Sequence, residues 1–252
     1  MRTIKGWGVG LMGALVGPAI AIAHANILDQ ALAGRQIFDH TPQAASRYVG
    51  DRLSCASCHL DSGKMAYAAP LWGAYPGYPR YQKKVGLVVN LRQRIQECFI
   101  FSERGHAPAA HGPIVGDIVA YAKWLANRHA DRPHFIPPGA GYAVLPYKGA
   151  GSAALGRTEF AKHCSVCHGA NGQGRLVRML SLYAPPLWGP HSFAQGAGMG
   201  NPAMAARFIW ANMPHGKHRV LAPAVARNIA DFIDSHHRPA PQQNVQTIFH
   251  RY

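Results

Sequence analysis

The chain has 252 residues, of which 48% are hydrophobic, so it can form one large or two small domains with buried cores, and its composition excludes a disordered chain or a collagen-like fibre. It carries 26 lysines and arginines against 11 acidic residues, a net charge of +15, and such a surface attracts anions. The basic residues are scattered and are not interleaved with an aromatic platform for single strands. We therefore expect small anions, anionic lipid or an acidic redox partner, and no nucleic acid.

The first 25 residues have the pattern of an export signal. Arg2 and Lys5 precede an apolar stretch, and Ala23-His24-Ala25 supplies the small-x-small pattern read by signal peptidase. We predict a signal peptide over residues 1–25 and a periplasmic protein that starts near Asn26. The alternative is an uncleaved membrane anchor, because residues 6–23 are just long enough to cross a bilayer. No other segment of the sequence could span one, so we expect no integral membrane segment in the mature chain.

The first chemical motif is Cys55-Ala56-Ser57-Cys58-His59, a C-x-x-C-H pattern. In this pattern both sulfurs form thioethers with the vinyl groups of haem, and the histidine ligates the iron. A thioredoxin-like redox pair or half of a zinc site would not need the histidine. The motif therefore predicts a covalently bound haem c held by Cys55, Cys58 and His59.

Cys98 has no partner for a disulfide in an oxidising compartment, because the other four cysteines fall in C-x-x-C-H motifs. It is a buried inert thiol, an intermolecular bridge, or a ligand to the first haem iron. Cys98 lies 39 positions after His59, which suits an axial ligand, whereas Met65 follows His59 too closely to cross the haem. His106 and His111 are the other candidates.

A linker separates two halves of the chain. Residues 134–152 are rich in proline and glycine and cannot continue a helix. We place the boundary near residue 145, which gives domains over 26–145 and 146–252. The tail beyond Arg238 is expected to be an irregular wrap or mobile.

The second half repeats the first. It contains a second haem motif, Cys164-Ser165-Val166-Cys167-His168, so we predict two haem c groups, the second held by Cys164, Cys167 and His168. Each motif follows a Gly-Arg pair and a phenylalanine and precedes a Pro-Leu-Trp-Gly segment. Each half closes with residues at the spacing of a buried helix face: Ile118, Tyr121, Trp124 and Leu125, then Ile229, Phe232 and Ile233. This order resembles the small cytochrome c fold twice over, so we predict an all-α protein of two tandem cytochrome c domains.

The second haem needs an axial ligand from downstream of His168. Met213, in Asn212-Met213-Pro214, is favoured because a proline after the methionine suits an extended loop at the haem edge. Met199 is the second choice, and if Met213 only packs, His191 or His215 would ligate. A thiolate ligand lowers the reduction potential and methionine raises it, so electrons would run from a Cys98 haem to a Met213 haem.

Several motifs together resemble the dihaem thiosulfate dehydrogenases that form tetrathionate. The similar stretches are 54–63, 69–73, Tyr78-Pro79, Arg94-Ile95-x-x-Cys98-Phe99-x-x-Ser102 and 208–214, and they cover nearly the whole mature chain. The Arg-Ile-x-x-Cys-Phe-x-x-Ser stretch also indicates a distant relationship to the haem-binding sulfur-oxidation cytochromes.

The resemblance implies roles for particular residues. Cys98 would ligate the active-site haem and Met213 the electron-transfer haem, while Arg94 and Ser102 would hold the anion. Lys84 stands where the family usually has arginine, so the contact of this side chain with the anion would lose its bidentate geometry. After Ser102 the chain reads Glu103-Arg104-Gly105 in place of methionine, asparagine and glycine, and a carboxylate beside an anion pocket is unfavourable unless Arg104 or another base neutralises it. Without the resemblance, Arg94, Lys84 and Ser102 would be interpreted as a solvated helix face with a cap.

The resemblance implies oxidation of two thiosulfate ions to tetrathionate, with the electrons passed to an acceptor such as another cytochrome or a high-potential iron-sulfur protein. Cys98 would leave the iron and form a transient adduct with the first thiosulfate, which the second would attack. The sequence leaves the reaction direction open. The competing function is a dihaem electron carrier without catalysis, which would need no thiolate-ligated haem. A dihaem peroxidase would need an open iron position, of which the sequence shows no sign.

Overall fold

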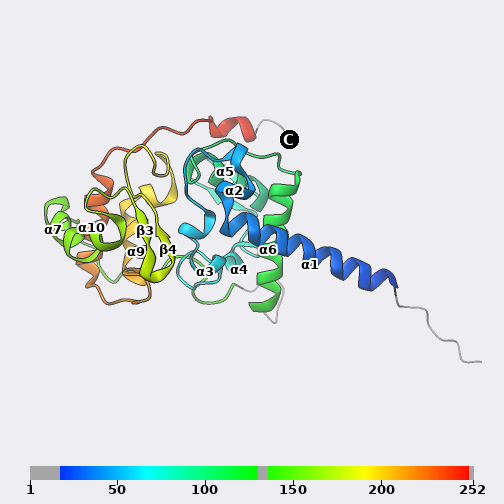
Figure 1. Cartoon of the computed structure of the whole chain (residues 1–252), viewed down its shortest axis with the longest axis horizontal. Coiled ribbons are helices and arrows are strands. Elements are labelled where there is room, and N and C mark those ends of the chain that lie inside the picture. The colour runs from blue at the N-terminus through cyan, green and yellow to red at the C-terminus, as the bar shows by residue number, and fades with distance from the viewer. Residues whose placement is uncertain (1–17, 130–135, 250–252) are drawn as a thin grey trace, which may run out of the picture.

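Both halves of the chain are built from an N-terminal helix packed against a C-terminal helix in the computed structural model, which describes residues 18–129 and 136–249 (Figure 1). The first half contains α1 (Pro18–Asp39), α2 (Thr41–Ala44), α3 (Leu60–Gly63), α4 (Leu71–Ala74), α5 (Leu91–Phe101) and α6 (Pro113–His129). The second half contains α7 (Ala153–His163), α8 (Ser165–His168), α9 (Pro202–Asn212) and α10 (Pro223–Asp234). Short 3-10 turns complete the helical structure: η1 (Ser46–Tyr48), η2 (Cys55–Ser57), η3 (Arg178–Leu180), η4 (Gly198–Gly200) and η5 (Val245–Ile248). The prediction of two helical domains is confirmed.

Two antiparallel hairpins add a detail that the all-α prediction lacks. The first joins β1 (Arg80–Gln82) to β2 (Leu87–Val89), with Arg80 opposite Val89. The second joins β3 (Arg175–Val177) to β4 (Leu182–Ala184), with Arg175 opposite Ala184. Each strand has three residues, and such a short ribbon is too small to show a period-2 pattern in the sequence.

The two glycines of the repeated Gly-Arg pairs allow the helices of each half to touch. A Cβ atom at Gly34 of α1 would lie 1.9 Å from the backbone oxygen of Asp117 in α6. A Cβ atom at Gly156 of α7 would lie 2.0 Å from the backbone oxygen of Asn228 in α10. Both distances are far inside van der Waals contact, so only glycine fits at these crossings. The glycine is therefore repeated because the helix packing requires it, and not because it has a chemical role.

The predicted buried faces of the closing helices form the two cores. In α6, Ile118, Tyr121 and Leu125 are buried, and Trp124 packs at their margin. In α10, Ile229, Phe232 and Ile233 are buried with Phe160 from α7 and Trp188 from the Pro-Leu-Trp-Gly segment. The phenylalanine after each Gly-Arg pair thus packs against the closing helix, where Phe38 meets Tyr121 edge-on at 6.0 Å.

The segment between the domains is ordered where it is described. The backbone N–H groups of Tyr67 and Ala69 donate to the carbonyls of Gly139 and Gly141, so this part packs on the first domain. Arg207 of α9 then donates to the carbonyls of Tyr142 and Ala143 at 2.9 and 2.6 Å. The predicted boundary near residue 145 stays a prediction.

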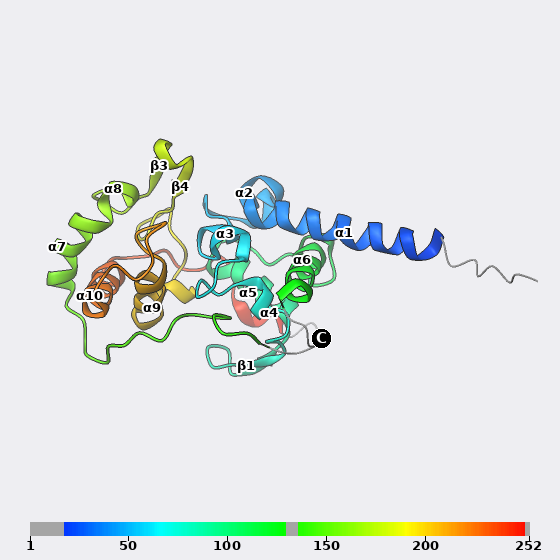
Figure 2. The ribbon, with the colours of Figure 1, turned by 90° about the horizontal axis from the view of Figure 1, so that it is seen from below.

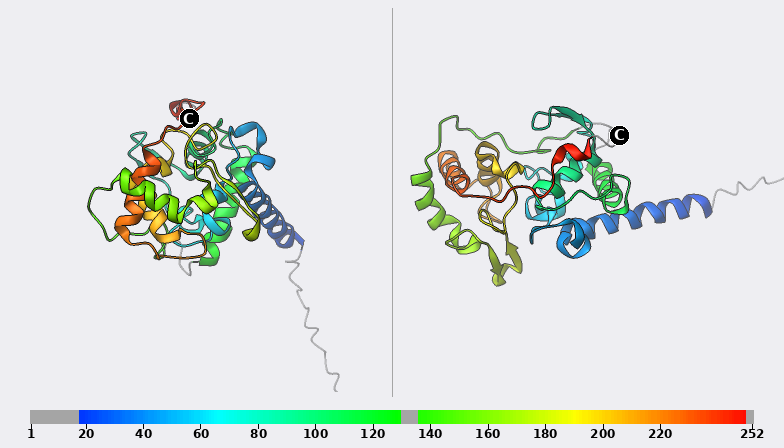
Figure 3. Two further views of the ribbon diagram at one scale, coloured as in Figure 1. Left: turned by 60° about the vertical axis from the view of Figure 1, so that its left-hand side comes forward. Right: turned by 90° about the horizontal axis from the view of Figure 1, so that it is seen from above.

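The C-terminal segment returns from the second domain to the first (Figure 3). The Gln243 side chain accepts a hydrogen bond from the backbone of Ala107 at 2.8 Å, and Ile248 of η5 is buried with Leu53 and Ile100. Of the two expectations for this tail, the structure shows the irregular wrap. The tail therefore adds to the contacts that join the two domains.

Helix α1 projects from the body of the molecule (Figure 1) and runs as one helix through the predicted cleavage position near Asn26. Most of the predicted signal peptide, residues 1–17, lies outside the described residues. Within the residues that the structure describes, none of the helices combines the length and the apolar character needed to cross a bilayer.

Replacing Gly34 with alanine is expected to lower the free energy of unfolding by about 1–3 kcal/mol, because the new methyl group forces α1 away from α6. Gly116→Ala in α6 is the matched control, since the nearest atom to its added Cβ is Arg92 Nη1 at 4.0 Å. That change should be neutral or stabilise the helix by up to about 1 kcal/mol. Chemical denaturation of the haem-loaded protein measures both, and equal effects would contradict the close-packing argument.

Candidate haem sites and anion-binding cluster

The first C-x-x-C-H motif forms a tight turn that ends at His59. Cys55 begins η2, and the side chains of Ser54 and Ser57 cap each other's backbone in a capping box. His59 Nδ1 lies 2.6 Å from the carbonyl oxygen of Ala69. Because a carbonyl can only accept, Nδ1 carries the ring proton and Nε2 keeps its lone pair, which is the arrangement a metal-ligating histidine needs.

The second motif repeats this geometry. His168 Nδ1 lies 2.8 Å from the carbonyl oxygen of Pro185. Ala69 and Pro185 occupy the same position, directly before the Pro-Leu-Trp-Gly segment of each half. The repeated segment therefore supplies the carbonyl that orients each histidine. The sequence repetition signalled this role, but the partner of each histidine could only be identified in the structure.

Burial keeps both histidines in the form that binds metal. It lowers the pKa of His59 and of His168, in each case against a smaller opposing effect of the backbone hydrogen bond. Burial also raises the pKa of Cys58 and of Cys164 to about 12.

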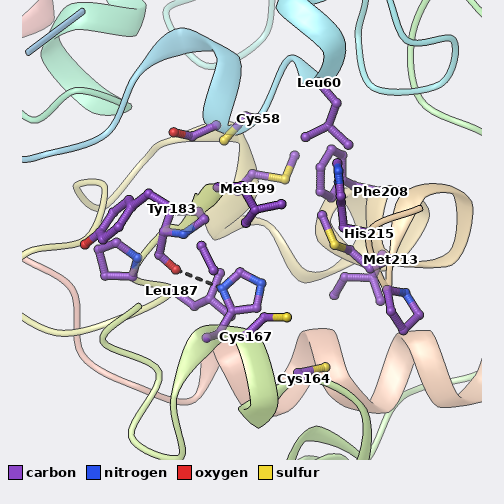
Figure 4. A pocket seen from close by; sticks show the side chains of 18 of the residues that line it. Cys58, Leu60, Cys164, Cys167, Tyr183, Leu187, Met199, Phe208, Met213 and His215 are labelled. Atoms are coloured by element: carbon purple, nitrogen blue, oxygen red, sulfur yellow. Dashed lines mark hydrogen bonds between the residues drawn. The ribbon is translucent and has the colours of Figure 1, made fainter. Parts of the chain in front are cut away.

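The second motif opens into a cavity with the composition of a haem pocket (Figure 4). Cys164 and Cys167 lie on one side of it and Met213 and His215 on another, with Met199 also pointing into the space. The remaining walls are mainly apolar. Two thiols, an imidazole with a free Nε2 and a thioether across an apolar cavity fit a haem c group with histidine and methionine ligands.

The residues that line this cavity reduce the number of candidates for the second ligand of the second haem iron. Met213, Met199 and His215 line it, whereas His191 is not among its lining residues. Met213 follows directly on α9, where Asn212 is 1% exposed and donates to the carbonyls of Phe208 and of Tyr67 in the first domain. The backbone before Met213 is thus fixed from both domains, which favours it as the sulfur with a defined position.

The two haem motifs share a wall. Leu53, Cys58 and Leu60 of the first domain line the cavity of the second (Figure 4). Leu60 also packs in one cluster with Phe208 and Met213. Groups bound at the two motifs would therefore lie close together, as electron exchange between them requires.

In the first domain, Arg94, Cys98 and Ser102 lie four residues apart, so they share one face of α5 and its C-terminal cap. The charge of Cys98 raises the pKa of Arg94, and Arg94 in turn opposes the rise that burial causes in the pKa of Cys98. Cys98 also contributes to the raised pKa of Cys55 and Cys58. Cys98 is therefore close enough to both Arg94 and the attachment thiols to interact electrostatically with them.

The histidine alternatives for the first haem occupy different surroundings from Cys98. His106 and His111 are both exposed, whereas Cys98 is half-buried between Glu97, 1% exposed, and Phe99, 1% exposed. The positions of these residues favour Cys98 as the ligand.

Arg94 is oriented by a buried carboxylate. Its Nη1 donates to Glu97 Oε2 at 2.6 Å. A guanidinium has five N–H donors, so the bond to Glu97 fixes the plane of the group and still leaves donors for an anion. The sequence-based argument did not single out Glu97.

Lys84 joins the same cluster from the loop between β1 and β2. Its ammonium nitrogen donates to the carbonyl of Gly196 in the second domain at 2.6 Å and lies 2.9 Å from the centre of the Phe101 ring. Burial of this group and the neighbouring positive charge of Arg94 lower the pKa of Lys84 to about 8, while Glu97 and Cys98 oppose that change.

Glu103 is buried next to the first haem motif. It is 2% exposed, it hydrogen-bonds with Cys55, and burial with the nearby Asp51 raises its pKa well above the usual range. Burial therefore favours the neutral form of this carboxyl group. Arg104, which the sequence offered as the neutralising base, donates to the carbonyl of Gly50.

Family models match both halves of the chain. Residues 43–127 match "SoxA/TsdA, cytochrome c domain" and residues 153–237 match "Cytochrome c". Such cytochrome c domains each hold one covalently bound haem c, so the chain has two.

Proteins that are similar over most of this chain are named thiosulfate dehydrogenase. A protein named thiosulfate dehydrogenase from Allochromatium vinosum is 35% identical over 240 residues, which cover 91% of this chain and 86% of that one. Another of that name, from Stutzerimonas stutzeri, is 42% identical over 207 residues, which cover 82% of this chain and 66% of that one. The solved "Thiosulfate dehydrogenase (TsdBA)" from Marichromatium purpuratum superimposes with a TM-score of 0.77 at 34% identity, over 89% of this chain and 50% of that one. The chain thus spans about half of the solved relative and just under two thirds of some curated ones.

Changing Met213 to alanine is expected to remove the methionine-to-iron absorption band of the oxidised second haem and to lower its midpoint potential by on the order of 100 mV. Met199→Ala is the matched control, because Met199 lines the same cavity, and it should keep both properties. Absorption spectroscopy and redox titration distinguish the two variants. Loss of the band in Met199→Ala, with the band retained in Met213→Ala, would assign the ligand to Met199.

Proposed function

Because the chain belongs to the thiosulfate dehydrogenase family, we propose that it oxidises thiosulfate and joins two thiosulfate ions into tetrathionate. The observation that carries this proposal is the cluster of Cys98, Arg94 and Lys84 beside the first haem motif. Arg94 and Cys98 share one face of α5, and the charges of Arg94 and Lys84 both oppose the rise that burial causes in the pKa of Cys98. A pure electron carrier needs neither a cysteine nor two cations at this place. We further propose that the protein acts in the periplasm, on the basis of the export signal pattern over residues 1–25.

Each haem is assigned to its own set of protein groups. Cys55 and Cys58 attach the first haem, with His59 and Cys98 as iron ligands. Cys164 and Cys167 attach the second, with His168 and Met213 as ligands. When bound, the two haems each accept one electron, so together they can take both electrons that a tetrathionate bond releases.

The anion-binding groups address the repulsion between two dianions. Arg94, held in place by Glu97, offers its remaining N–H donors, and the Lys84 ammonium, at the edge of the domain interface, adds a second positive charge. Ser102, one turn after Cys98, can donate its hydroxyl hydrogen to a sulfonate oxygen. These groups let the two substrates approach closely enough for their outer sulfurs to react.

Cys98 provides the route for bond formation. Cys98 would leave the iron, and its thiolate would form a sulfur–sulfur bond with the outer sulfur of the first thiosulfate. The two electrons released by this oxidation would be taken by the two haems, one each. The second thiosulfate then attacks that outer sulfur, releases the Cys98 thiolate and gives tetrathionate. Burial raises the pKa of Cys98, and the positive charge of Arg94 opposes that rise, which favours thiolate as the leaving group. Charge and sulfur are conserved in both steps, and no proton is consumed.

The direct test adds thiosulfate to the anaerobic, oxidised protein and follows the haem absorption bands while tetrathionate is assayed. We expect rapid haem reduction with one tetrathionate formed per two haems reduced. If thiosulfate leaves both haems oxidised while other small reductants reduce them, the chain is an electron carrier or an oxidase of another sulfur compound.

Within this assay Cys98→Gly is expected to lower the rate by on the order of 10³-fold or more, since the variant loses the sulfur that reacts. Both haems should stay attached, because neither attachment motif is changed, and the absorption of the second haem should be unaltered. Haem content per chain provides that control. Normal turnover by Cys98→Gly would disprove the covalent route.

The pKa of Lys84 predicts an alkaline limit to substrate binding. The amino group is positive below its pKa of about 8 and neutral above it, so kcat/KM for thiosulfate should fall as the pH rises through about 8. Lys84→Arg should remove this fall, because a guanidinium stays charged over the whole range. Steady-state kinetics from pH 6 to 10 measures both profiles, and an unchanged alkaline limb in Lys84→Arg would show that Lys84 is not the titrating group.

A further inference from the structure

An exposed apolar patch lies beside the second haem cavity. Val166 of α8 is 64% exposed, Leu176 of β3 is 59% exposed, and Met179, between β3 and β4, is 97% exposed. Helix α8 packs against β3, and Figure 2 shows α8 and the hairpin together at one side of the second domain. We refer to Val166, Leu176 and Met179 as the hairpin patch.

A bound haem does not account for the hairpin patch. Leu180, Leu182 and Tyr183 of the same hairpin line the haem cavity, so a haem would cover them. None of the three patch residues is among the residues that line this cavity. Three large apolar side chains therefore remain in solvent on α8, which carries Cys167, and on the hairpin that packs against it, and exposed apolar side chains of this kind are typical of an interaction surface.

The charge around the hairpin patch is positive. Arg175 and Arg178 are exposed on the hairpin itself, directly beside Leu176 and Met179. Residues 146–252 contain 11 lysines and arginines and only three acidic residues. All three acidic residues are paired within the domain, Glu159 with His163, Asp231 with Arg227 and Asp234 with Arg238. A partner for this surface must therefore supply negative charge.

We propose that the hairpin patch, with Arg175 and Arg178 at its rim, is the docking surface for an acidic electron-transfer protein that takes electrons from the second haem. A small apolar centre with a charged rim suits a transient redox complex, in which charge steers the encounter and a limited buried area allows rapid release. The position fits as well, because this hairpin also forms part of the haem cavity wall and so brings the partner close to the haem edge. The inference rests on the proposed function, since it identifies where electrons leave.

The test uses the full haem-loaded chain, reduced with dithionite, freed of excess reductant and mixed with oxidised plant plastocyanin, an acidic copper protein. Stopped-flow absorbance gives the second-order rate of electron transfer. Because no thiosulfate is present, failure of the dehydrogenase proposal and failure of the docking proposal give separate results.

Arg175→Glu/Arg178→Glu is expected to lower this rate by about tenfold or more at low ionic strength, with a smaller effect at high salt. Leu176→Ser/Met179→Ser should lower it several-fold at both ionic strengths, because apolar contact is not screened. The control Lys148→Glu/Arg157→Glu changes the net charge equally at exposed positions outside the hairpin and should stay within about twofold of the unchanged protein. Haem spectra and potentials are measured for each variant to exclude damage to the haem site.

Two results would overturn the proposal. Equal losses in the arginine and control variants would mean that net charge alone governs the encounter. Unchanged rates in Leu176→Ser/Met179→Ser would mean that the partner docks elsewhere. Mitochondrial cytochrome c, which is basic around its haem edge, provides the reverse probe, and its rate should rise in Arg175→Glu/Arg178→Glu.

Discussion

The close crossing of an N-terminal helix and a C-terminal helix is the constraint on which each domain depends. At Gly34 and Gly156 the helix backbones approach so closely that no side chain fits between them. This contact brings Phe38 or Phe160 onto the closing helix and fixes the start of the loop that carries the C-x-x-C-H motif. The loop then returns to the histidine through the carbonyl of Ala69 or Pro185, so each iron ligand is held at a definite angle.

The interface between the domains converts two cytochrome modules into one site. Lys84 of the first domain donates to Gly196 of the second, and Asn212 of the second donates to the carbonyl of Tyr67 of the first. The lysine proposed to bind the anion and the segment before Met213, the proposed ligand, therefore both depend on the same interface. The C-terminal segment closes the arrangement by packing Ile248 against the first domain. Restricting the relative motion of the domains keeps the two haem motifs against a shared wall, which supports transfer of electrons from one to the other.

We propose two separate uses of positive charge in this protein. At the first haem motif, Arg94 and Lys84 lie in partly buried surroundings where charges interact strongly, and both affect the pKa of Cys98; in the proposed mechanism they also hold the substrate. On the second domain, Arg175 and Arg178 are exposed, and in the proposed docking surface they act at longer range, where salt screens them. Two buried carboxyl groups lie near the cluster at the first haem motif. Glu97 is bonded to Arg94, and burial raises the pKa of Glu103, which favours its neutral form.

The sequence by itself determined the haem chemistry, the helical class and the duplication. Cys55 to His59 and Cys164 to His168 are short contiguous motifs, and the buried faces of α6 and α10 follow a local periodicity, so neither requires knowledge of distant contacts. Only the tertiary structure decided the carbonyl partner of each histidine and the contact of Lys84 with the second domain. It also decided the burial of Glu103 and the packing of the C-terminal segment on the first domain. Each of these depends on residues that are distant in sequence, or on the burial that such residues produce, and no local pattern encodes a partner 112 positions away, as for Lys84 and Gly196.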